Sequence, residues 1–486
     1  MTDSPAIHFG TDGWRGVIAD EFTFANVRRV ALATGHFIKQ QRAGGPILIG
    51  YDRRFLSKQF ADCVGEVFQS QGLAVRLSQQ PMPTPAISVC VTTEKAPWGI
   101  MITASHNPAF YNGFKIKDTH GRSAPPEVTQ AIEQLINQEQ NPSPAPLPLG
   151  RGEGRGEGFA SFDFNANYER YLKSRLDWKI LKTLKGTVVF DHLYGTAAGI
   201  PEALLKNTSL KIISLHASLD PLFGGLHPEP IEANLAELKN SVRKNRALLG
   251  IALDGDADRL GLVDDTGQYL TPHQVFPLLA LHCIEHKGWK GKIVQSVSLG
   301  ALGERIAQAF GLPFEEVPVG FKHVAERMLK EDILAGGEES GGYAIRGGIP
   351  ERDGILSGLL FLEMLAARKK KLSLLLRDME KRFGRARFKR IDMPLGTPIG
   401  DKFVFVKRMT DSLPDRLLRS PIAQVRTQDG LKICLQNGAW VLLRPSGTEP
   451  LLRTYAESES WNQTDQLLLW ARKRVSEVLS KSSNGI

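Results

Sequence analysis

Short apolar runs alternate with longer amphipathic segments over most of the chain. Apolar runs that end in turn residues are typical of buried strands, whereas apolar positions spaced three and four residues apart indicate helices. Three successive rounds of this alternation cover residues 47–102, 187–253 and 292–330. The pattern predicts three similar α/β domains with mixed sheets around a shared central cleft.

The strands of these rounds are predicted at residues 47–51, 74–77, 98–102, 187–190, 211–215, 249–253, 292–297 and 314–317. Helices are predicted at residues 55–71, 197–206, 231–244, 302–310, 323–330 and 355–367. The C-terminal region differs, because its alternating positions predict antiparallel strands at residues 422–425, 432–435, 440–443 and 451–456, before a helix at 461–479. A smaller α+β domain therefore completes a fold of the α/β class.

Domain boundaries are placed where the composition changes. The predicted segments are residues 1–140, 141–160, 161–267, 268–384 and 385–486. The second segment is a linker or insertion, because NPSPAPLPLGRGEGRGEG at residues 141–158 is too rich in proline and glycine to build a core. Binding of RNA or of a partner by its two arginines is disfavoured, since the adjacent glutamates cancel their charge.

Composition narrows the classes of function. A chain of 486 residues with 42% hydrophobic content can bury several cores. Its net charge of +9 suits an anionic ligand, but lysine and arginine are spread along the chain, without the concentrated basic face that nucleic-acid binding needs. The four cysteines lie far apart without a CxxC pair, which predicts thiols in a reducing cytoplasm. We find no signal peptide and no apolar run of membrane-spanning length, and expect a cytoplasmic protein.

A first candidate site lies where the predicted strand at 98–102 ends. The run MITASHNP at residues 101–108 passes from apolar residues into Ser105 and His106, and Lys115 follows after turn residues. Loops at strand ends are where open α/β sheets hold ligands. Serine and asparagine are also ordinary turn formers, so this run taken alone favours a simple turn.

Three aspartates at alternate positions form a second candidate site. Asp254, Asp256 and Asp258 follow the apolar run at 249–253, and their mutual repulsion must be offset by a cation or by water. Carboxylate oxygens suit Mg²⁺ or Ca²⁺, and the absence of a Glu at the twelfth loop position argues against a calcium loop. Arg259 stands beside the acids, as a phosphate clamp would. A solvated acidic turn is the alternative.

Two further segments have the composition of ligand-binding loops. GGEESGGYAIRGG at residues 336–348 places acids and a serine among glycines, where they can accept hydrogen bonds from sugar hydroxyls. RPSGTEPLLR at residues 444–453 has the arginines, hydroxyls and glycine of a phosphate cradle, but it is not a Walker loop. An acidic surface hairpin and a strand-end turn with surface arginines are the respective alternatives.

In this order, the segments resemble the α-D-phosphohexomutase superfamily, and its phosphoglucomutase/phosphomannomutase branch in particular. The resemblance spans nearly the whole chain and is carried by FGTDGWRG at 9–16, TASHNP at 103–108, DGDADR at 254–259, GEES at 337–340 and RPSGTEP at 444–450. It implies a Mg²⁺-dependent phosphohexomutase that interconverts hexose 1-phosphate and hexose 6-phosphate. A sugar 1,6-bisphosphate is the implied intermediate and activator. Hexose phosphates are the implied partners, without nucleic acid or membrane, and the expected state is a monomer or homodimer.

The resemblance also implies roles for individual residues. Ser105 matches the phosphoryl-carrying serine, and its phosphate completes a Mg²⁺ site with Asp254, Asp256 and Asp258. The residues implied around the transferring group are Arg15, His106 and Lys115. Charge neutralisation and in-line positioning by such groups are what phosphoryl transfer demands.

Substrate contacts are implied at three places. Glu338 and Ser340 match the pair that holds sugar hydroxyls. The residues that match the grip on the non-reacting phosphate are Arg444, Ser446, Gly447, Thr448 and Arg453. Lys322 lies in a Gly-aromatic-Lys run similar to that of glucose-handling members, although an ordinary lysine at a helix start is the alternative.

Two departures from the family pattern affect these expectations. Some members have a histidine shortly after the GEES serine, whereas Gly341, Gly342 and Tyr343 follow here, so the proton acceptor is unassigned, with Lys115 or His106 as candidates. Ala257 replaces a glycine of the metal loop, and its methyl group is expected to be harmless if the local φ is negative.

The sugar is expected to be glucose, because the Lys322 run and the GEES segment look more like those of phosphoglucomutases. Mannose and glucosamine phosphates are the alternatives, since one epimeric hydroxyl gives little discrimination. A bisphosphate synthase or phosphatase and a non-catalytic sugar-phosphate sensor also stay open. Intact Ser105 and the three aspartates argue against the sensor.

Overall fold

The chain is described by a computed structural model over residues 7–10, 12–42, 44–138, 159–395, 399, 401–446 and 450–483. It divides into two compact units. The first consists of Met1–Leu270, Met328–Lys330 and Ser340–Leu372, and the second of Thr271–Arg327, Glu331–Glu339 and Ser373–Ile486. The predicted linker at residues 141–158 lies outside the described residues.

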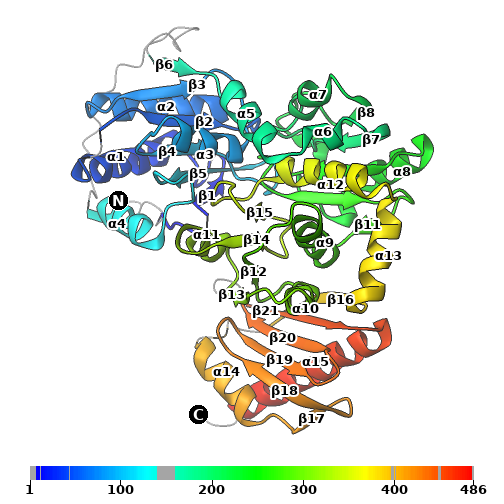
Figure 1. Ribbon diagram of the computed structural model, residues 1–486. Helices are drawn as coiled ribbons and strands as arrows, with labels where there is room; N and C mark the ends of the chain where they lie inside the picture. The colour runs from blue at the N-terminus through cyan, green and yellow to red at the C-terminus, as the bar shows by residue number, and fades with distance from the viewer. Residues whose placement is uncertain are drawn as a thin grey trace. The chain divides into compact units, whose positions relative to one another are not determined.

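The first sheet of the first unit has the strand order β1-β5-β4-β2-β3-β6 (Figure 1). Its strands are β1 (Trp14–Val17), β2 (Ile47–Tyr51), β3 (Val75–Ser78), β4 (Gly99–Ile102), β5 (Tyr111–Lys117) and β6 (Ala160–Phe162). The helices in this part of the chain are α1 (Phe24–Gln40), α2 (Ser57–Ser70), α3 (Thr84–Thr93) and α4 (Pro126–Gln138). β2 runs parallel to β3 and β4, whereas β5 is antiparallel to β4, so the sheet is mixed as predicted.

A continuous apolar core fixes the position of this sheet. Every residue of β2 is buried, as in a strand that is covered on both faces. Helix α1 begins after Thr23, whose side chain accepts a hydrogen bond from the backbone N–H of Asn26. Val27 and Val30 of that helix then pack into the same core. The end of β4, where Ser105 follows, is therefore anchored on a rigid layer.

The second sheet of the first unit has the strand order β11-β10-β9-β7-β8. Its strands are β7 (Lys185–Asp191), β8 (Ser209–Leu215), β9 (Leu249–Leu253), β10 (Leu260–Val263) and β11 (Tyr269–Leu270). The helices in this part of the first unit are α5 (Asn165–Arg175), α6 (Trp178–Leu181), α7 (Ile200–Leu205), α8 (Ala236–Asn245) and α12 (Gly354–Arg368). The strand β15 (Tyr343–Ile345) belongs to a different sheet, with the order β13-β12-β14-β15. In the antiparallel pair β9–β10, Leu253 lies opposite Leu260, so residues 254–259 form the loop that joins two adjacent strands.

The second unit begins with three parallel strands, β12 (Lys292–Ser296) between β13 (Phe314–Val317) and β14 (Ile333–Gly337). The helices around them are α9 (Pro272–Glu285), α10 (Leu302–Ala309), α11 (Phe321–Lys330) and α13 (Leu372–Phe383). Helices α9 and α10 pack against each other and against strands of this sheet.

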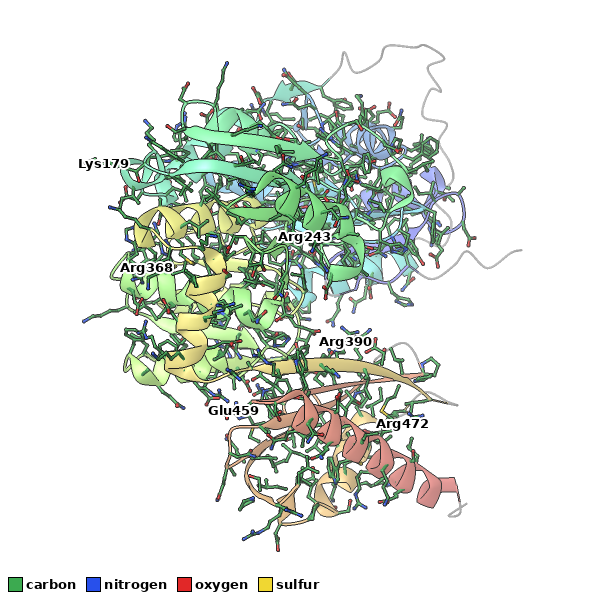
Figure 2. The ribbon with its side chains drawn as sticks, turned by 90° about the vertical axis from the view of Figure 1, so that its right-hand side faces the viewer. Lys179, Arg243, Arg368, Arg390, Glu459 and Arg472 are labelled. Atoms are coloured by element: carbon green, nitrogen blue, oxygen red, sulfur yellow. The ribbon has the colours of Figure 1, made fainter. Side chains whose placement is uncertain are left out.

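An antiparallel sheet with the order β16-β21-β20-β19-β18-β17 ends the chain. Its strands are β16 (Arg387–Pro394), β17 (Arg416–Leu417), β18 (Ser420–Arg426), β19 (Leu431–Leu435), β20 (Trp440–Pro445) and β21 (Leu451–Ser458). Helices α14 (Lys402–Asp411) and α15 (Trp461–Ser483) pack against it and against each other. Figure 2 labels Arg390 on β16 and Arg472 on α15 of this domain.

The structure confirms the predicted fold class, three α/β regions followed by a smaller α+β domain. The domain boundaries and the shared cleft stay predictions. All four cysteines lie within the described residues, and none forms a disulfide. Within the same residues, every helix is too short or too polar to cross a membrane.

Candidate active site

Ser105 lies in the loop that joins β4 to β5. Its side chain is buried, with 1% of its surface exposed, and its backbone is left-handed with φ 53°. The hydroxyl donates a hydrogen bond to Oδ2 of Asp254 at 2.8 Å, and Oγ lies 3.4 Å from Nδ1 of His106. A left-handed residue other than glycine costs roughly 1–3 kcal/mol and persists only when its surroundings hold it in place.

Arg54, which follows β2, holds the backbone of this loop. Its side chain is buried and donates to four backbone carbonyls, those of Ser105, Asn107, Pro108 and Tyr111. The bonds made by Nη2 to Ser105 and Asn107 measure 2.5 and 2.6 Å. Nε of Arg54 lies 3.1 Å from Oδ2 of Asp52, so the buried cation has a buried anion beside it. The strained Ser105 conformation is therefore fixed by an arginine of the neighbouring strand.

Asp52 holds the start of the same loop. It accepts hydrogen bonds at 2.6 Å from the hydroxyls of Thr103 and Ser57. The Thr103 hydroxyl oxygen in turn accepts the backbone N–H of Ser105 at 2.9 Å. Asp52 and Arg54 thus hold the Ser105 loop at both of its ends.

The aspartate loop between β9 and β10 presents three buried carboxylates. Asp254, Asp256 and Asp258 are each 0% exposed, and one oxygen from each lies within 4.8 Å of the others. At that separation each pair of ionised carboxylates repels by about 3 kcal/mol at an effective dielectric constant of about 20. Burial, followed by the neighbouring charges of Asp258 and Asp256, raises the pKa of Asp254 well above its ordinary value.

The unpaired oxygens of this loop fit a divalent cation. Oδ1 of Asp256 and Oδ1 of Asp258 are buried and lack a hydrogen-bond partner among the described residues. Buried carboxylate oxygens without partners are costly, and hard oxygen donors in a cluster are the ligands that Mg²⁺ prefers. The donor set therefore supports the metal site predicted from the sequence.

Lys115 on β5 supplies the nearest positive charge to these aspartates. Its Nζ lies 2.9 Å from Asp256, 3.5 Å from Asp258 and 2.8 Å from Asp12. Although burial lowers it, the charges of Asp12 and Asp256 hold the pKa of Lys115 above its ordinary value. Lys115 therefore places an ammonium donor beside these aspartates.

Ala257 departs from the conformation expected for it. Its φ is +60°, in the left-handed region, so the condition under which its methyl group was expected to be harmless is not met. Strain of this kind costs roughly 1–2 kcal/mol. Two hydrogen bonds hold the residue in place, because its N–H donates to the carbonyl of Asp254 and its own carbonyl accepts from Gly354.

Three other predicted residues lie around the two loops in the first unit. Nη1 of Arg15, on β1, donates to Oδ1 of Asn107 at 2.6 Å, next to the Ser105 turn. Burial, and then the positive charges of Arg259 and Arg15, lower the pKa of His106 well below its usual value. Arg259 pairs with Glu229 at 3.2 Å, and its backbone N–H donates to Asp254.

The sequence analysis missed several residues that hold the aspartates. The hydroxyl of Thr84 donates to Asp256 at 2.6 Å. Nη2 of Arg352 pairs with Asp258 at 2.8 Å and with Asp12 at 2.6 Å. Asp12 lies inside the FGTDGWRG segment, so the motif could have identified it as a site residue. The sequence around Arg352 gives no sign that this arginine pairs with an aspartate of the site.

The second unit contains the predicted sugar and phosphate residues apart from Arg259 and Ser340. Glu338 directly follows β14 and is buried, and its Oε1 accepts the backbone N–H of Gly320 at 2.8 Å. Lys322 lies in the first turn of α11, two residues after Gly320. The unit therefore brings the Glu338 carboxylate next to the Gly-aromatic-Lys run. Ser340 belongs to the first unit, and its Oγ is buried without a hydrogen-bond partner among the described residues.

The predicted phosphate grip lies at the end of β20 and the start of β21. Arg444 and Arg453 are directly opposite each other in this antiparallel pair. Like charges in that position are unfavourable unless an anion lies between or beside them. Nε of Arg444 donates to Asp429 at 2.8 Å, and the same carboxylate oxygen accepts the N–H of Val319. Asp429, which the sequence analysis did not select, thus links Arg444 to the segment that precedes Lys322.

The remaining residues of the predicted grip are only partly described. Ser446 is buried, and its backbone N–H donates to the carbonyl of Leu451 at 2.8 Å. Gly447 and Thr448 lie outside the described residues.

Comparisons with known proteins agree with the geometry. Four family models match the chain, the α/β/α domains I, II and III and the C-terminal domain of phosphoglucomutase/phosphomannomutase, at residues 6–143, 166–267, 271–383 and 406–468. A probable phosphoglucosamine mutase of Methanothermobacter thermautotrophicus is 32% identical over 463 residues, 93% of this chain and 94% of that protein. A phosphoglucomutase/phosphomannomutase of Thermococcus kodakarensis is 29% identical over 97% of this chain and 99% of its own length.

A crystal structure of a putative phosphomannomutase from Thermus thermophilus superposes with a TM-score of 0.84. It is 35% identical in sequence and covers 97% of this chain and 100% of its own. All four domain models match in order, and they span both of the loops that meet at Ser105 and Asp254. The chain therefore belongs to the phosphoglucomutase/phosphomannomutase family of the α-D-phosphohexomutase superfamily and is a phosphohexomutase.

Proposed function

We propose that the chain is a Mg²⁺-dependent mutase that interconverts hexose 1-phosphate and hexose 6-phosphate through phospho-Ser105. The observation that carries this proposal is the hydrogen bond of 2.8 Å from Oγ of Ser105 to Asp254. It joins a buried hydroxyl to a loop of three buried carboxylates, two of which have an oxygen without a hydrogen-bond partner among the described residues. A nucleophile, a cation site and an ammonium group thus converge at one place in the first unit.

Phosphoryl transfer in this site is a balanced exchange of oxygen–phosphorus bonds. Phospho-Ser105 gives its phosphoryl group to the unphosphorylated hydroxyl of the sugar, the P–Oγ bond breaks, and the hydroxyl proton leaves to a nearby acceptor. The bisphosphate then returns its other phosphoryl group to Oγ of Ser105: the P–O bond to the sugar breaks as the P–Oγ bond forms, and the freed sugar oxygen takes up the proton from the acceptor. His106 is the candidate acceptor by geometry, because its Nδ1 lies 3.4 Å from Oγ.

The charges around Ser105 suit a loose phosphoryl-transfer transition state, in which negative charge spreads over the equatorial oxygens. When bound by Asp254, Asp256 and Asp258, Mg²⁺ supplies Lewis-acid neutralisation of those oxygens. The Lys115 ammonium and the Arg15 guanidinium supply further fixed positive charge. Arg54 keeps the Oγ carrier in place while the substrate exchanges.

The second unit supports recognition of the rest of the substrate. Arg444 and Arg453 place two guanidinium groups opposite each other on β20 and β21, and paired guanidinium donors suit a dianionic phosphate. Glu338 has the carboxylate chemistry that a sugar hydroxyl needs as an acceptor. We assign Arg444 and Arg453 to the non-reacting phosphate, and Glu338 with Ser340 to the sugar hydroxyls.

We propose glucose phosphates as the preferred substrates. Support comes from the Gly-aromatic-Lys run that contains Lys322 and from the GEES segment. The relatives carry names that point to glucosamine, glucose and mannose phosphates, so these three sugars are the set to compare.

The decisive experiment is a coupled assay of glucose 1-phosphate turnover, with and without glucose 1,6-bisphosphate and Mg²⁺. We expect Mg²⁺-dependent isomerisation that Ser105→Ala reduces by several orders of magnitude. Ser88→Ala is a matched control, because that buried serine bonds only to a helix carbonyl. Undiminished turnover in Ser105→Ala would exclude the phosphoserine route, and net release of phosphate or build-up of bisphosphate would favour a phosphatase or synthase.

The sugar is tested by comparing kcat/KM for glucose, mannose and glucosamine 1-phosphates under the same conditions. A higher value for glucosamine or mannose would overturn the glucose assignment and leave the mutase assignment intact.

A further inference from the structure

The first unit contains a cavity of about 360 Å³ that holds none of the proposed catalytic or substrate-binding residues. Its wall is formed by the turn after β2, the segment before α3, the first turns of α5, and the loop and helix that follow β7. This volume lies in the range of cavities that hold small organic ligands, roughly 300–1,000 Å³.

The wall combines an apolar floor with one cation, Arg53, and one carboxylate, Glu169, which is exposed and pairs with Lys173. The buried floor residues are Phe164, Tyr168, Leu172 and Leu204. Polar and exposed side chains, among them Gln80 and Asn165, form the rim. The ligand class that matches is a small organic molecule with an apolar body.

Arg53 supplies the charge that such a ligand must complement. Its guanidinium is half-buried in the wall and donates one hydrogen bond, from Nη1 to the carbonyl of Ala217 at 3.0 Å. No carboxylate pairs with it within 4.0 Å in the described part of the chain. The charge of Glu202 acts on Arg53, but the carboxylate of Glu202 is hydrogen-bonded to His192 and Ser214. A cation removed from water without an ion pair favours an anion beside it.

Three residues of the wall connect directly to the groups that position the active site. Thr196 donates its backbone N–H to the carbonyl of Gly255, inside the aspartate loop, at 3.1 Å. Arg53 lies between the two residues that hold the Ser105 loop. The hydroxyl of Tyr168 donates to Asp353 at 2.9 Å, and Asp353 follows the arginine that pairs with Asp258.

We propose that this cavity is a regulatory site for a small organic anion with an apolar body. The anionic group pairs with Arg53, and the body lies on the aromatic floor. A bound ligand changes the positions of the aspartate and Ser105 loops through the turn at Arg53 and the contact at Thr196, and turnover changes with occupancy.

The probe for the test is 2-naphthoate, a flat aromatic carboxylate, compared with its neutral partner 2-naphthamide. Binding to the full chain is measured by calorimetry in the presence of saturating glucose 1,6-bisphosphate, which blocks the proposed substrate site. We expect 2-naphthoate to bind at least about tenfold more tightly than 2-naphthamide, since a charge-assisted hydrogen bond contributes at least that factor. Arg53→Met is expected to remove the difference, and Arg170→Met, which removes an exposed arginine of α5 outside the cavity, is expected to retain it.

Equal affinity of 2-naphthoate for wild type and Arg53→Met would overturn the site, and so would displacement of the probe by glucose 1,6-bisphosphate. Ala203→Trp gives an independent check, because it fills the cavity from an exposed position and is expected to abolish binding. Retained binding in that variant would also overturn the site. In turnover assays, 2-naphthoate is expected to change kcat of wild type and Arg170→Met but not of Arg53→Met, and an unchanged wild-type rate would refute the regulatory role. Binding is measured directly, so failure here leaves the proposed mutase function untouched.

Discussion

The hydrogen bonds from Arg54 to the Ser105 loop give the most specific prediction. Arg54 uses its two terminal nitrogens on four backbone carbonyls and places Nε against Asp52. Lysine at this position keeps a positive charge but has all three donors on one nitrogen. It therefore cannot reproduce the hydrogen bonds that the two terminal nitrogens of the guanidinium make to four carbonyls. Arg54→Lys therefore keeps the charge balance with Asp52 and releases part of the loop.

The magnitude follows from the bonds that are lost. Each hydrogen bond from a charged donor contributes about 1.5–3 kcal/mol, so losing one or two weakens the hold on the loop by about 2–5 kcal/mol. The left-handed Ser105 backbone stores roughly 1–3 kcal/mol that the freed loop can release by relaxing. Displacement of a reacting oxygen by about 1 Å costs on the order of a hundredfold in rate. We expect kcat of Arg54→Lys to fall by roughly 10- to 100-fold with a much smaller change in KM.

The assay is steady-state turnover of glucose 1-phosphate, with phosphate on Ser105 quantified by mass spectrometry. Arg53→Lys is the matched control, because the hydrogen bond described for the adjacent arginine goes to the carbonyl of Ala217 and not to the Ser105 loop, so turnover without an added ligand is expected to stay at the wild-type value. An unchanged kcat in Arg54→Lys, with an unchanged melting temperature, would refute the claim that this side chain positions Ser105. A large rise in KM at constant kcat would place the effect in substrate binding instead.

Three further predictions concern the metal loop, the phosphate grip and pH. Asp256→Asn is expected to raise the Mg²⁺ concentration needed for half-maximal turnover at least tenfold, measured by Mg²⁺ titration, and an unchanged requirement would contradict the loop assignment. Arg453→Met is expected to raise KM for hexose phosphate about tenfold or more with a much smaller change in kcat, because a charged donor to the non-reacting phosphate is lost; an unchanged KM would contradict it. Burial raises the pKa of Asp353 to about 7. The native state therefore keeps a proton that the unfolded chain releases at the ordinary carboxyl pKa of about 4. The free energy of unfolding is expected to fall as pH rises from about 4 to 7. Asp353→Asn can still accept the hydrogen bonds from Tyr168 and Leu356 and does not titrate, so it should remove this pH-dependent loss of stability, up to about 4 kcal/mol. The melting temperature of the variant relative to wild type should therefore rise between pH 5 and 8. Parallel pH profiles of the two proteins would refute the raised pKa of Asp353.

Many of the strands and helices, such as β2, β9 and α12, could be predicted from the sequence because their patterns are local, whereas α1, α9 and the Lys115 strand β5 were not predicted. The buried run of β2 and the loop of three aspartates each lie within a few consecutive residues. The confirmed family assignment rests on the order of five such segments.

The partners of the site residues could not be predicted in the same way, because they lie far apart along the chain. Thr84 reaches Asp256 across 172 positions, and Arg352 reaches Asp12 across 340. For Arg54 the sequence offers one weak local indication of a role in the site. It stands in an Asp-X-Arg run that follows a predicted buried strand, at residues 47–51. The sequence gives no indication that Ala257 has a left-handed backbone, because its neighbouring residues do not reveal the sign of φ.

The buried ion pair of Lys117 has a consequence for synthesis of the chain. This side chain of β5 is 0% exposed, and its carboxylate partner Glu351 lies 234 residues later. Until residue 351 has left the ribosome, a nascent chain that has completed the first sheet lacks this carboxylate, and among the described residues Lys117 has only the hydroxyl of Ser123 and the nearby charge of Asp12. The buried ion pair forms only when the segment around Glu351 packs on the sheet. The N-terminal domain is thus expected to reach full stability only late in translation, when a distant carboxylate arrives.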